Sequence, residues 1–148
     1  MKKYLVIGNP IEHSLSPKLH NHWIKENNIN AIYNRKQLNE SDIESIITEV
    51  KNEKIYGINV TVPFKKSVIP FLDQLTPLAK EAQSVNTIFK KDNKVVGDNT
   101  DVGGFEQSLE YINYNVKNKK VFILGAGGVV PSILKALEKL KVSKVYIS

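Results

Sequence analysis

The sequence contains no cysteine, which excludes disulfide bonds and thiolate metal sites. It also lacks any apolar run approaching the roughly 18 residues of a membrane span. The apolar stretch Tyr4–Ile7 is shorter than the roughly 7–15 residues of a signal peptide's hydrophobic region, so we expect a first strand there. These absences are typical of a cytoplasmic protein with no membrane partner.

Arginine is almost absent too, because Arg35 is the only one among 21 basic residues. Sequence-specific contacts to nucleic-acid bases favour the arginine fork. The lysines are spread along the chain, and their largest clusters are pairs such as Lys90-Lys91 and Lys119-Lys120. We therefore interpret the net charge of +6 as solvated surface that attracts acidic small molecules, and we expect no nucleic-acid partner.

Strands and helices are expected to alternate along the 148 residues, which predicts an α/β fold with a largely parallel sheet. The expected strands are Lys3–Gly8, Ala31–Tyr33, Ile55–Val62, Val85–Phe89, Lys94–Gly97, Val121–Leu124 and Val145–Ile147, and the fourth and fifth form a hairpin. Helices are expected to begin at Ser16, at a capping box Ser41–Glu44, at about Phe64 until Pro70, at about Val102 until Tyr114, and after Gly128 until about Leu140.

The segment GAGG at Gly125–Gly128 lies between an apolar strand and a helix. Glycine turns in this context let backbone N–H groups approach a pyrophosphate at the helix N-terminus. Val130 stands at the third glycine position, so the pattern is incomplete. The turn therefore predicts dinucleotide binding, with a tight strand–helix connection without a ligand as the alternative.

Three other segments have polar side chains with two possible roles each. Ser14 and Ser16, before a helix, can donate to a carboxylate, or Ser16 can cap that helix. Asp101 can be a catalytic group or a helix N-cap. The pair Lys65-Lys66 follows the strand GINVTVP, at the expected start of a helix. A cation is unfavourable there, because the N-terminus of a helix carries a partial positive charge. The alternative is that these lysines are merely solvated.

The histidines His13, His20 and His22 do not predict a metal site. His20 and His22 lie two residues apart on an expected helix and so do not share a face.

Taken together, five segments resemble the shikimate dehydrogenase family, whose members reduce 3-dehydroshikimate to shikimate with NADPH. They are IGNPIEHSLSP, GINVTVPFK, SVNTI, GDNTDVGGF and LGAGGVVPS, in the family's order from Ile7 to Ser132. The resemblance implies that Lys65 is the catalytic acid or base and that Asp101 is its partner. The implied contacts to the substrate carboxylate are Ser14 and Ser16, those to its hydroxyl and keto oxygens are Asn59, Thr61, Asn86 and Asp101, and those to the pyrophosphate of NADP(H) are Gly125, Ala126, Gly127, Gly128 and Val129.

Members of this family are roughly twice as long, so we expect an N-terminal fragment. Residues 1–101 would form a three-layer α/β/α substrate domain with a mostly parallel sheet. Residues 102–148 would form a linking helix and the first βαβ unit of a Rossmann-like dinucleotide-binding domain. The sequence does not decide between an enzyme, a module that binds shikimate-like acids without hydride transfer, and a dehydrogenase that also accepts quinate. Nor does it distinguish a monomer from a homodimer.

Overall fold

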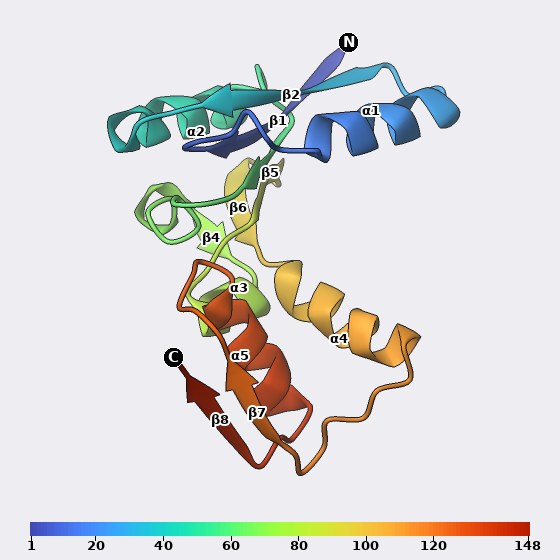
Figure 1. Cartoon of the computed structure of the whole chain (residues 1–148). Helices are drawn as coiled ribbons and strands as arrows, with labels where there is room; N and C mark the ends of the chain where they lie inside the picture. Colours follow the sequence, from blue (N-terminus) through green and yellow to red (C-terminus); the bar gives the residue numbers. More distant parts are fainter.

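The computed structural model describes all 148 residues as eight strands, five α-helices and two short 3₁₀ helices (Figure 1). The strands are β1 (Lys2–Gly8), β2 (Ala31–Gln37), β3 (Gly57–Val60), β4 (Gln74–Leu75), β5 (Thr87–Lys91), β6 (Lys94–Asp98), β7 (Lys120–Ile123) and β8 (Lys144–Ile147). The helices are α1 (Ser16–Glu26), η1 (Glu40–Asp42), α2 (Ile43–Lys51), η2 (Ile69–Phe71), α3 (Pro77–Ala82), α4 (Asp101–Tyr111) and α5 (Val130–Lys139).

Six strands form one sheet in the order β2-β1-β3-β5-β6-β4. Strand β1 pairs in parallel with β2 and β3, and β4 pairs in parallel with β6. Only β5 runs the other way, antiparallel to β3 and β6. The mostly parallel sheet and the β5–β6 hairpin are therefore confirmed.

The two faces of β1 pack against different helices, so the six-stranded sheet is the middle one of three layers. Val6 faces α1 and packs in a small cluster with Ile11 and Tyr33. Ile7, the next residue, points to the opposite face and belongs to the main core. Helix α2 covers that face with four buried residues at helical spacing: Ile43, Ile46, Ile47 and Val50.

Strands β7 and β8 form a separate parallel pair at the end of the molecule opposite β1 and β2 (Figure 1). Helix α5 connects them and packs against α3 and α4, where Ala82, Val102 and Ala136 form a buried cluster. The side chains of Phe122 and Leu124 are 61% and 84% exposed. This strand–helix–strand unit thus matches the predicted βαβ, and its apolar residues are partly uncovered.

Two local predictions were wrong. No α-helix begins at Phe64, since residues 62–68 form turns that lead into η2. Pro70 has no N–H to continue a helix, and the N–H of Ile69 bonds to the carbonyl of Lys66 instead. The start of the second helix also differs, because the N–H of Asn39 bonds to the Asp42 carboxylate at 2.8 Å, two residues before the predicted box.

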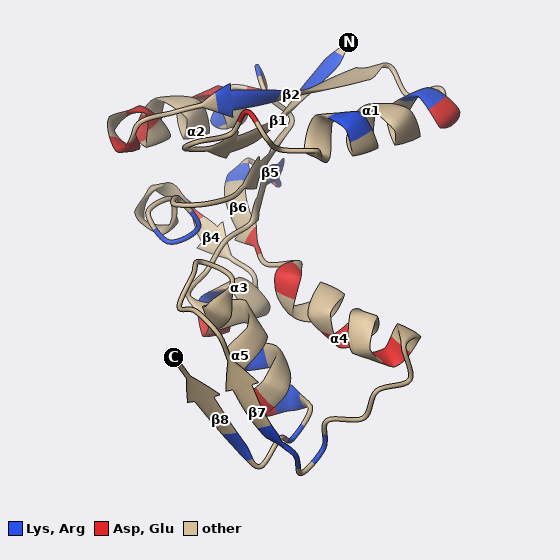
Figure 2. Ribbon diagram, in the orientation of Figure 1, with Lys and Arg blue, Asp and Glu red and all other residues tan.

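The fold collects lysines that are only paired in the sequence. Lys120 and Lys144 are neighbours in the β7–β8 register, and backbone hydrogen bonds bring Lys119 beside Ser143 and Lys141 beside Asn118. Figure 2 shows this basic group at the end of the molecule where β7 and β8 begin. Lysines that are spread along the sequence are therefore gathered in space at this end. No helix has the length and apolarity that a membrane crossing requires.

Candidate active site

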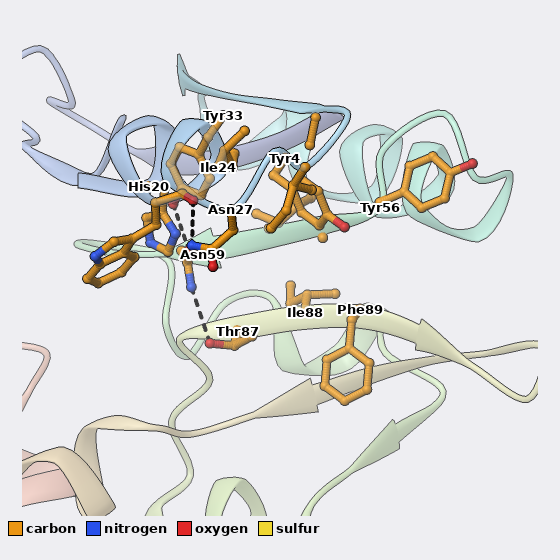
Figure 3. A pocket seen from close by; sticks show the side chains of 15 residues that line it. Tyr4, His20, Ile24, Asn27, Tyr33, Tyr56, Asn59, Thr87, Ile88 and Phe89 are labelled. Atoms are coloured by element: carbon orange, nitrogen blue, oxygen red, sulfur yellow. Dashed lines mark hydrogen bonds between the residues drawn. The ribbon is translucent and has the colours of Figure 1, made fainter. Parts of the chain in front are cut away.

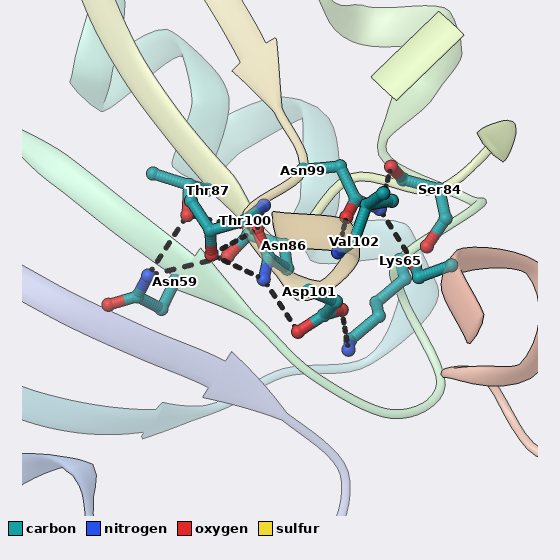
Figure 4. A network of polar contacts seen from close by, with 10 residues as sticks. Asn59, Lys65, Ser84, Asn86, Thr87, Asn99, Thr100, Asp101 and Val102 are labelled. Carbon is teal, nitrogen blue, oxygen red and sulfur yellow. Dashed lines mark hydrogen bonds and ion pairs between the residues drawn. The ribbon is translucent and has the colours of Figure 1, made fainter. Parts of the chain in front are cut away.

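The carboxyl ends of the parallel strands carry a lysine–aspartate ion pair (Figure 4). Lys65 lies in the turns after β3, and its carbonyl accepts the N–H of Val85 at 2.8 Å. Asp101 is the first residue of α4, three positions after the last residue of β6, Asp98. The Lys65 Nζ lies 2.7 Å from Asp101 Oδ2, with the two side chains 14% and 23% exposed. Residues 36 positions apart in the sequence thus meet at one sheet edge.

Asn86 fixes the other carboxylate oxygen of this pair. Its Nδ2 donates to Asp101 Oδ1 at 2.8 Å and to Thr100 Oγ1 at 2.9 Å. Its Oδ1 accepts the N–H of Thr100 and the hydroxyl of Thr87, both at 3.0 Å. Because β5 runs opposite to its neighbours, the residue before β5 lies at the edge where those neighbours end. The antiparallel strand therefore brings Asn86 to Asp101.

Asn59, on β3, continues the polar network toward α1. Its Nδ2 donates to Thr87 Oγ1 at 3.3 Å, and its Oδ1 accepts the hydroxyl of Tyr33 at 2.6 Å. Burial raises the pKa of the Tyr33 hydroxyl above its usual range, and a hydrogen bond with Ser16 opposes this only in part. The hydroxyl therefore stays protonated and orients Asn59.

The sequence prediction missed Tyr33, Thr87 and Thr100 as members of this network. Thr87 and Thr100 are adjacent to predicted site residues inside the SVNTI and GDNTDVGGF segments, which is a usable signal. Tyr33 lies on β2 and gives no such signal, because a tyrosine in a strand is usually part of the core.

Ser14 and Ser16 line a small pocket of about 250 Å³ together with Thr61 and His13. The Ser14 Oγ accepts the N–H of Ser16 at 3.3 Å. Leu15 holds the N-cap position of α1 without a side-chain cap, so the expected alternative of Ser16 as the cap is wrong. Both serine hydroxyls can donate to an anion at this helix start, where the helix dipole favours negative charge.

The glycine turn faces the two lysines across a pocket of about 280 Å³, which Lys65, Lys66 and Ser84 line with residues 126–128. Lys66 is exposed, and it also borders this pocket. Gly125 has a φ of +95°, a conformation that glycine adopts readily. None of the N–H groups of residues 126–129 donates to a backbone carbonyl. These free donors before α5 can bind a phosphate group.

A larger pocket, about 420 Å³ and lined mainly by apolar residues, lies on the α1 face of the sheet (Figure 3). His20 stacks on Tyr33 at 4.2 Å between ring centroids, and burial lowers the pKa of the His20 imidazole. Asn59 and Thr87 form the polar end of the pocket. Histidine, aspartate and glutamate side chains form no group of three or more that could hold a metal ion.

These features define an α/β protein with polar pockets at the carboxyl ends of its parallel strands, next to a Rossmann-like βαβ unit. A sequence profile of the shikimate dehydrogenase substrate binding domain matches residues 6–88. The chain belongs to the shikimate dehydrogenase family.

Similar proteins have the same family name. A shikimate dehydrogenase (NADP(+)) from Pelagibacter ubique is 60% identical over 147 residues, which are 99% of this chain and 56% of that protein. One from Clostridium perfringens is 41% identical, covering 99% of this chain and 54% of that protein. The chain thus spans about half the length of the curated relatives it matches.

Solved structures agree with the fold. A shikimate dehydrogenase from Aquifex aeolicus superposes with a TM-score of 0.91 at 38% identity, covering 99% of this chain and 56% of that one. The Thermus thermophilus enzyme, solved with NADP(H) and shikimate, superposes with a TM-score of 0.89 at 28% identity over 99% of this chain and 56% of that one. The predicted mostly parallel α/β architecture is confirmed by these matches.

Proposed function

We propose that this chain is the substrate-binding and catalytic half of an enzyme that reduces 3-dehydroshikimate to shikimate with NADPH. The observation that carries the proposal is the ion pair of Lys65 and Asp101, since it lies between polar side chains suited to the substrate and a glycine turn suited to the cofactor. The names of the relatives support both the substrate and NADP.

In this proposal the substrate carboxylate binds at the start of α1. Ser14 and Ser16 donate their hydroxyl hydrogens to it, and the positive end of the helix dipole adds to the attraction. Thr61 borders the same pocket and contacts a ring hydroxyl. Asn59, Asn86 and Asp101 contact the other hydroxyl and keto oxygens. The hydrogen bonds from Asn59 to Thr87 and from Asn86 to Asp101 hold these side chains in place before the substrate arrives.

Lys65 provides the proton. NADPH, when bound, would supply the hydride for the keto carbon. The Lys65 ammonium gives a proton to the keto oxygen, so that the ketone becomes an alcohol. Asp101 holds the Lys65 ammonium at 2.7 Å and orients its remaining N–H bonds. In the oxidative direction Lys65 takes the proton back from the hydroxyl group.

The cofactor pyrophosphate is proposed to bind at Gly125, Ala126, Gly127, Gly128 and Val129. A Cβ built at Gly127 meets no atom within 4 Å, so the turn has an open surface. Val130 at the third glycine position is only 9% exposed and borders the pocket beside the turn. The residues present therefore fit the group.

We also propose that residues 1–101 form a substrate domain and that residues 102–148 form a dinucleotide-binding part. The isolated 148-residue chain is expected to bind shikimate but to transfer no hydride, because it matches only about half of each relative. A cytoplasmic location, a monomeric or homodimeric state, and the lack of nucleic-acid and membrane partners are proposed as well. The alternatives are a module that binds without turnover and a dehydrogenase that also accepts quinate.

A chimera tests the enzyme directly. Residues 1–148 replace the 147 matching residues of the Pelagibacter ubique relative, and the purified protein is assayed for NADP⁺ reduction with shikimate and, separately, with quinate. The proposal expects turnover with shikimate that is lost in Lys65→Ala. A folded chimera that binds shikimate without turnover would favour the binding module, and comparable rates with both acids would favour the broader dehydrogenase.

A further inference from the structure

Asn99 is a buried polar residue that the proposed chemistry does not use. It is 2% exposed and lies between the end of β6 and the start of α4. Its Nδ2 donates to the carbonyl of Ser84 at 2.8 Å and to Ser132 Oγ at 2.9 Å, and its Oδ1 accepts the N–H of Val102 at 3.2 Å (Figure 4). Both donor hydrogens and the acceptor are therefore engaged.

The three bonds reach three parts of the site. Ser84 lies two residues before Asn86, and Val102 follows Asp101, so two of the bonds hold the backbone beside the polar network. Ser132 lies in the first turn of α5, immediately after the glycine turn, and its side chain is fully buried. The side-chain amide of Asn99 thus connects three segments: the one with Asn86, the one with Asp101, and the helix α5 that follows the glycine turn.

The contact to Ser132 differs from the other contacts of α5. The ion pairs Lys135–Glu81 and Lys139–Glu106 also join α5 to α3 and α4, but each includes at least one well exposed side chain. The apolar cluster around Ala136 is non-directional. The Asn99–Ser132 bond is the one buried side-chain hydrogen bond between α5 and the rest of the chain, and a directional bond fixes orientation.

We propose that Asn99 is a positioning residue that sets the glycine turn relative to the Lys65–Asp101 pair. The proposal rests on the proposed function, because that distance determines how the hydride donor and the proton donor meet one substrate. Reacting atoms must come within about 3–3.5 Å, and a misplacement of about 1 Å can lower the rate about 100-fold. Loss of the bond therefore impairs turnover without removing a substrate contact.

The first test measures, in the 148-residue chain, the position of the β7–β8 unit relative to the six-stranded sheet and its helices. The chain has no cysteine, so the exposed residues Lys18 on α1 and Lys120 on β7 can be changed to cysteine and spin-labelled without background. Pulsed electron paramagnetic resonance then gives the distance distribution between the labels. Ser132→Ala is expected to broaden or shift this distribution.

The matched control is Ser108→Ala, since the Ser108 hydroxyl donates only within α4, to the carbonyl of Phe105. It should leave the label distribution unchanged. Asn99→Ala should broaden the distribution further, and Ser132→Ala decides the outcome if that variant does not fold. A distribution in Ser132→Ala that is indistinguishable from the control would overturn the proposal.

The second test uses the chimera and separates positioning from mere stability. At a temperature where every variant is folded, Ser132→Ala should lower kcat about 10- to 100-fold and leave the shikimate KM nearly unchanged, whereas Ser108→Ala changes neither. An unchanged kcat would overturn the inference while leaving the proposed function intact. If the unsubstituted chimera were inactive, the proposed function would fail and the spin-label distances alone would decide the structural role of Asn99.

Discussion

Lys65 and Lys66 are adjacent in the sequence but differ in their surroundings. Lys65 is mostly buried and paired with Asp101, whereas Lys66 is exposed and pairs with no carboxylate. Asp101 in turn is held by Asn86, so the position of the Lys65 ammonium depends on a chain of hydrogen bonds. A single residue step along the turn therefore separates a cation held by a carboxylate from an exposed one.

This difference predicts unequal kinetic effects. In the chimera, Lys65→Ala should lower kcat about 10²- to 10⁴-fold, the usual contribution of a proton donor, with the shikimate KM within a few-fold. Lys66→Ala is the control and should leave kcat almost unchanged, although it borders the glycine-turn pocket. Equal losses of kcat in the two variants would contradict the assignment of Lys65 as the proton donor.

The two serines at the start of α1 should act on binding. Ser14→Ala and Ser16→Ala each remove a hydrogen bond to a charged carboxylate, worth about 1.5–3 kcal/mol, so the Kd of shikimate should rise about 10- to 100-fold. Calorimetric titration measures this, and thermal unfolding serves as the control. A lower unfolding temperature with an unchanged Kd would mean that the hydroxyls only stabilise the helix start.

At the scale of elements, the sequence predicted most strands and helices because their apolar spacing is local. Helix α2 is the clearest case, since its apolar residues recur at helical spacing in the sequence and are all buried. The helix expected at Phe64 does not form, because the hydrogen bonds of turns between Pro63 and Pro70 take its place. The site was harder to predict: Tyr33 and Asn59 meet across 26 positions, and only the sheet order brings them together.

Two glycines test the packing of these elements. A Cβ at Gly97 on β6 would lie 2.5 Å from Leu72 Cδ1 and 3.0 Å from atoms of Leu75 and Val85, so Gly97→Ala should lower the free energy of unfolding by about 1–3 kcal/mol. At Gly104 on α4 a Cβ meets nothing within 4 Å, so Gly104→Ala should raise it by about 0.5–1 kcal/mol. Urea unfolding measures both, and a stabilised Gly97→Ala would contradict the tight packing of β6.

At the scale of the whole molecule, two units are joined by buried contacts of α3, α4 and α5. The residues proposed to contact the substrate lie on the six-stranded sheet or on the loops and helix starts that follow or precede its strands, and the β7–β8 unit carries the glycine turn. A polar site built on one sheet and on the loops and helix starts beside it can form without the region of the relatives that this chain does not match. The account therefore predicts that the 148-residue chain binds shikimate, although weakly.

Titration of the purified 148-residue chain with shikimate in a calorimeter tests this central claim most directly. The account predicts saturable binding of one shikimate per chain, weakened in Ser16→Ala and unaffected in Ser108→Ala. Circular dichroism on the same samples establishes that each is folded. A folded chain that releases no heat of binding even at millimolar shikimate would contradict the claim that residues 14–101 form the substrate site.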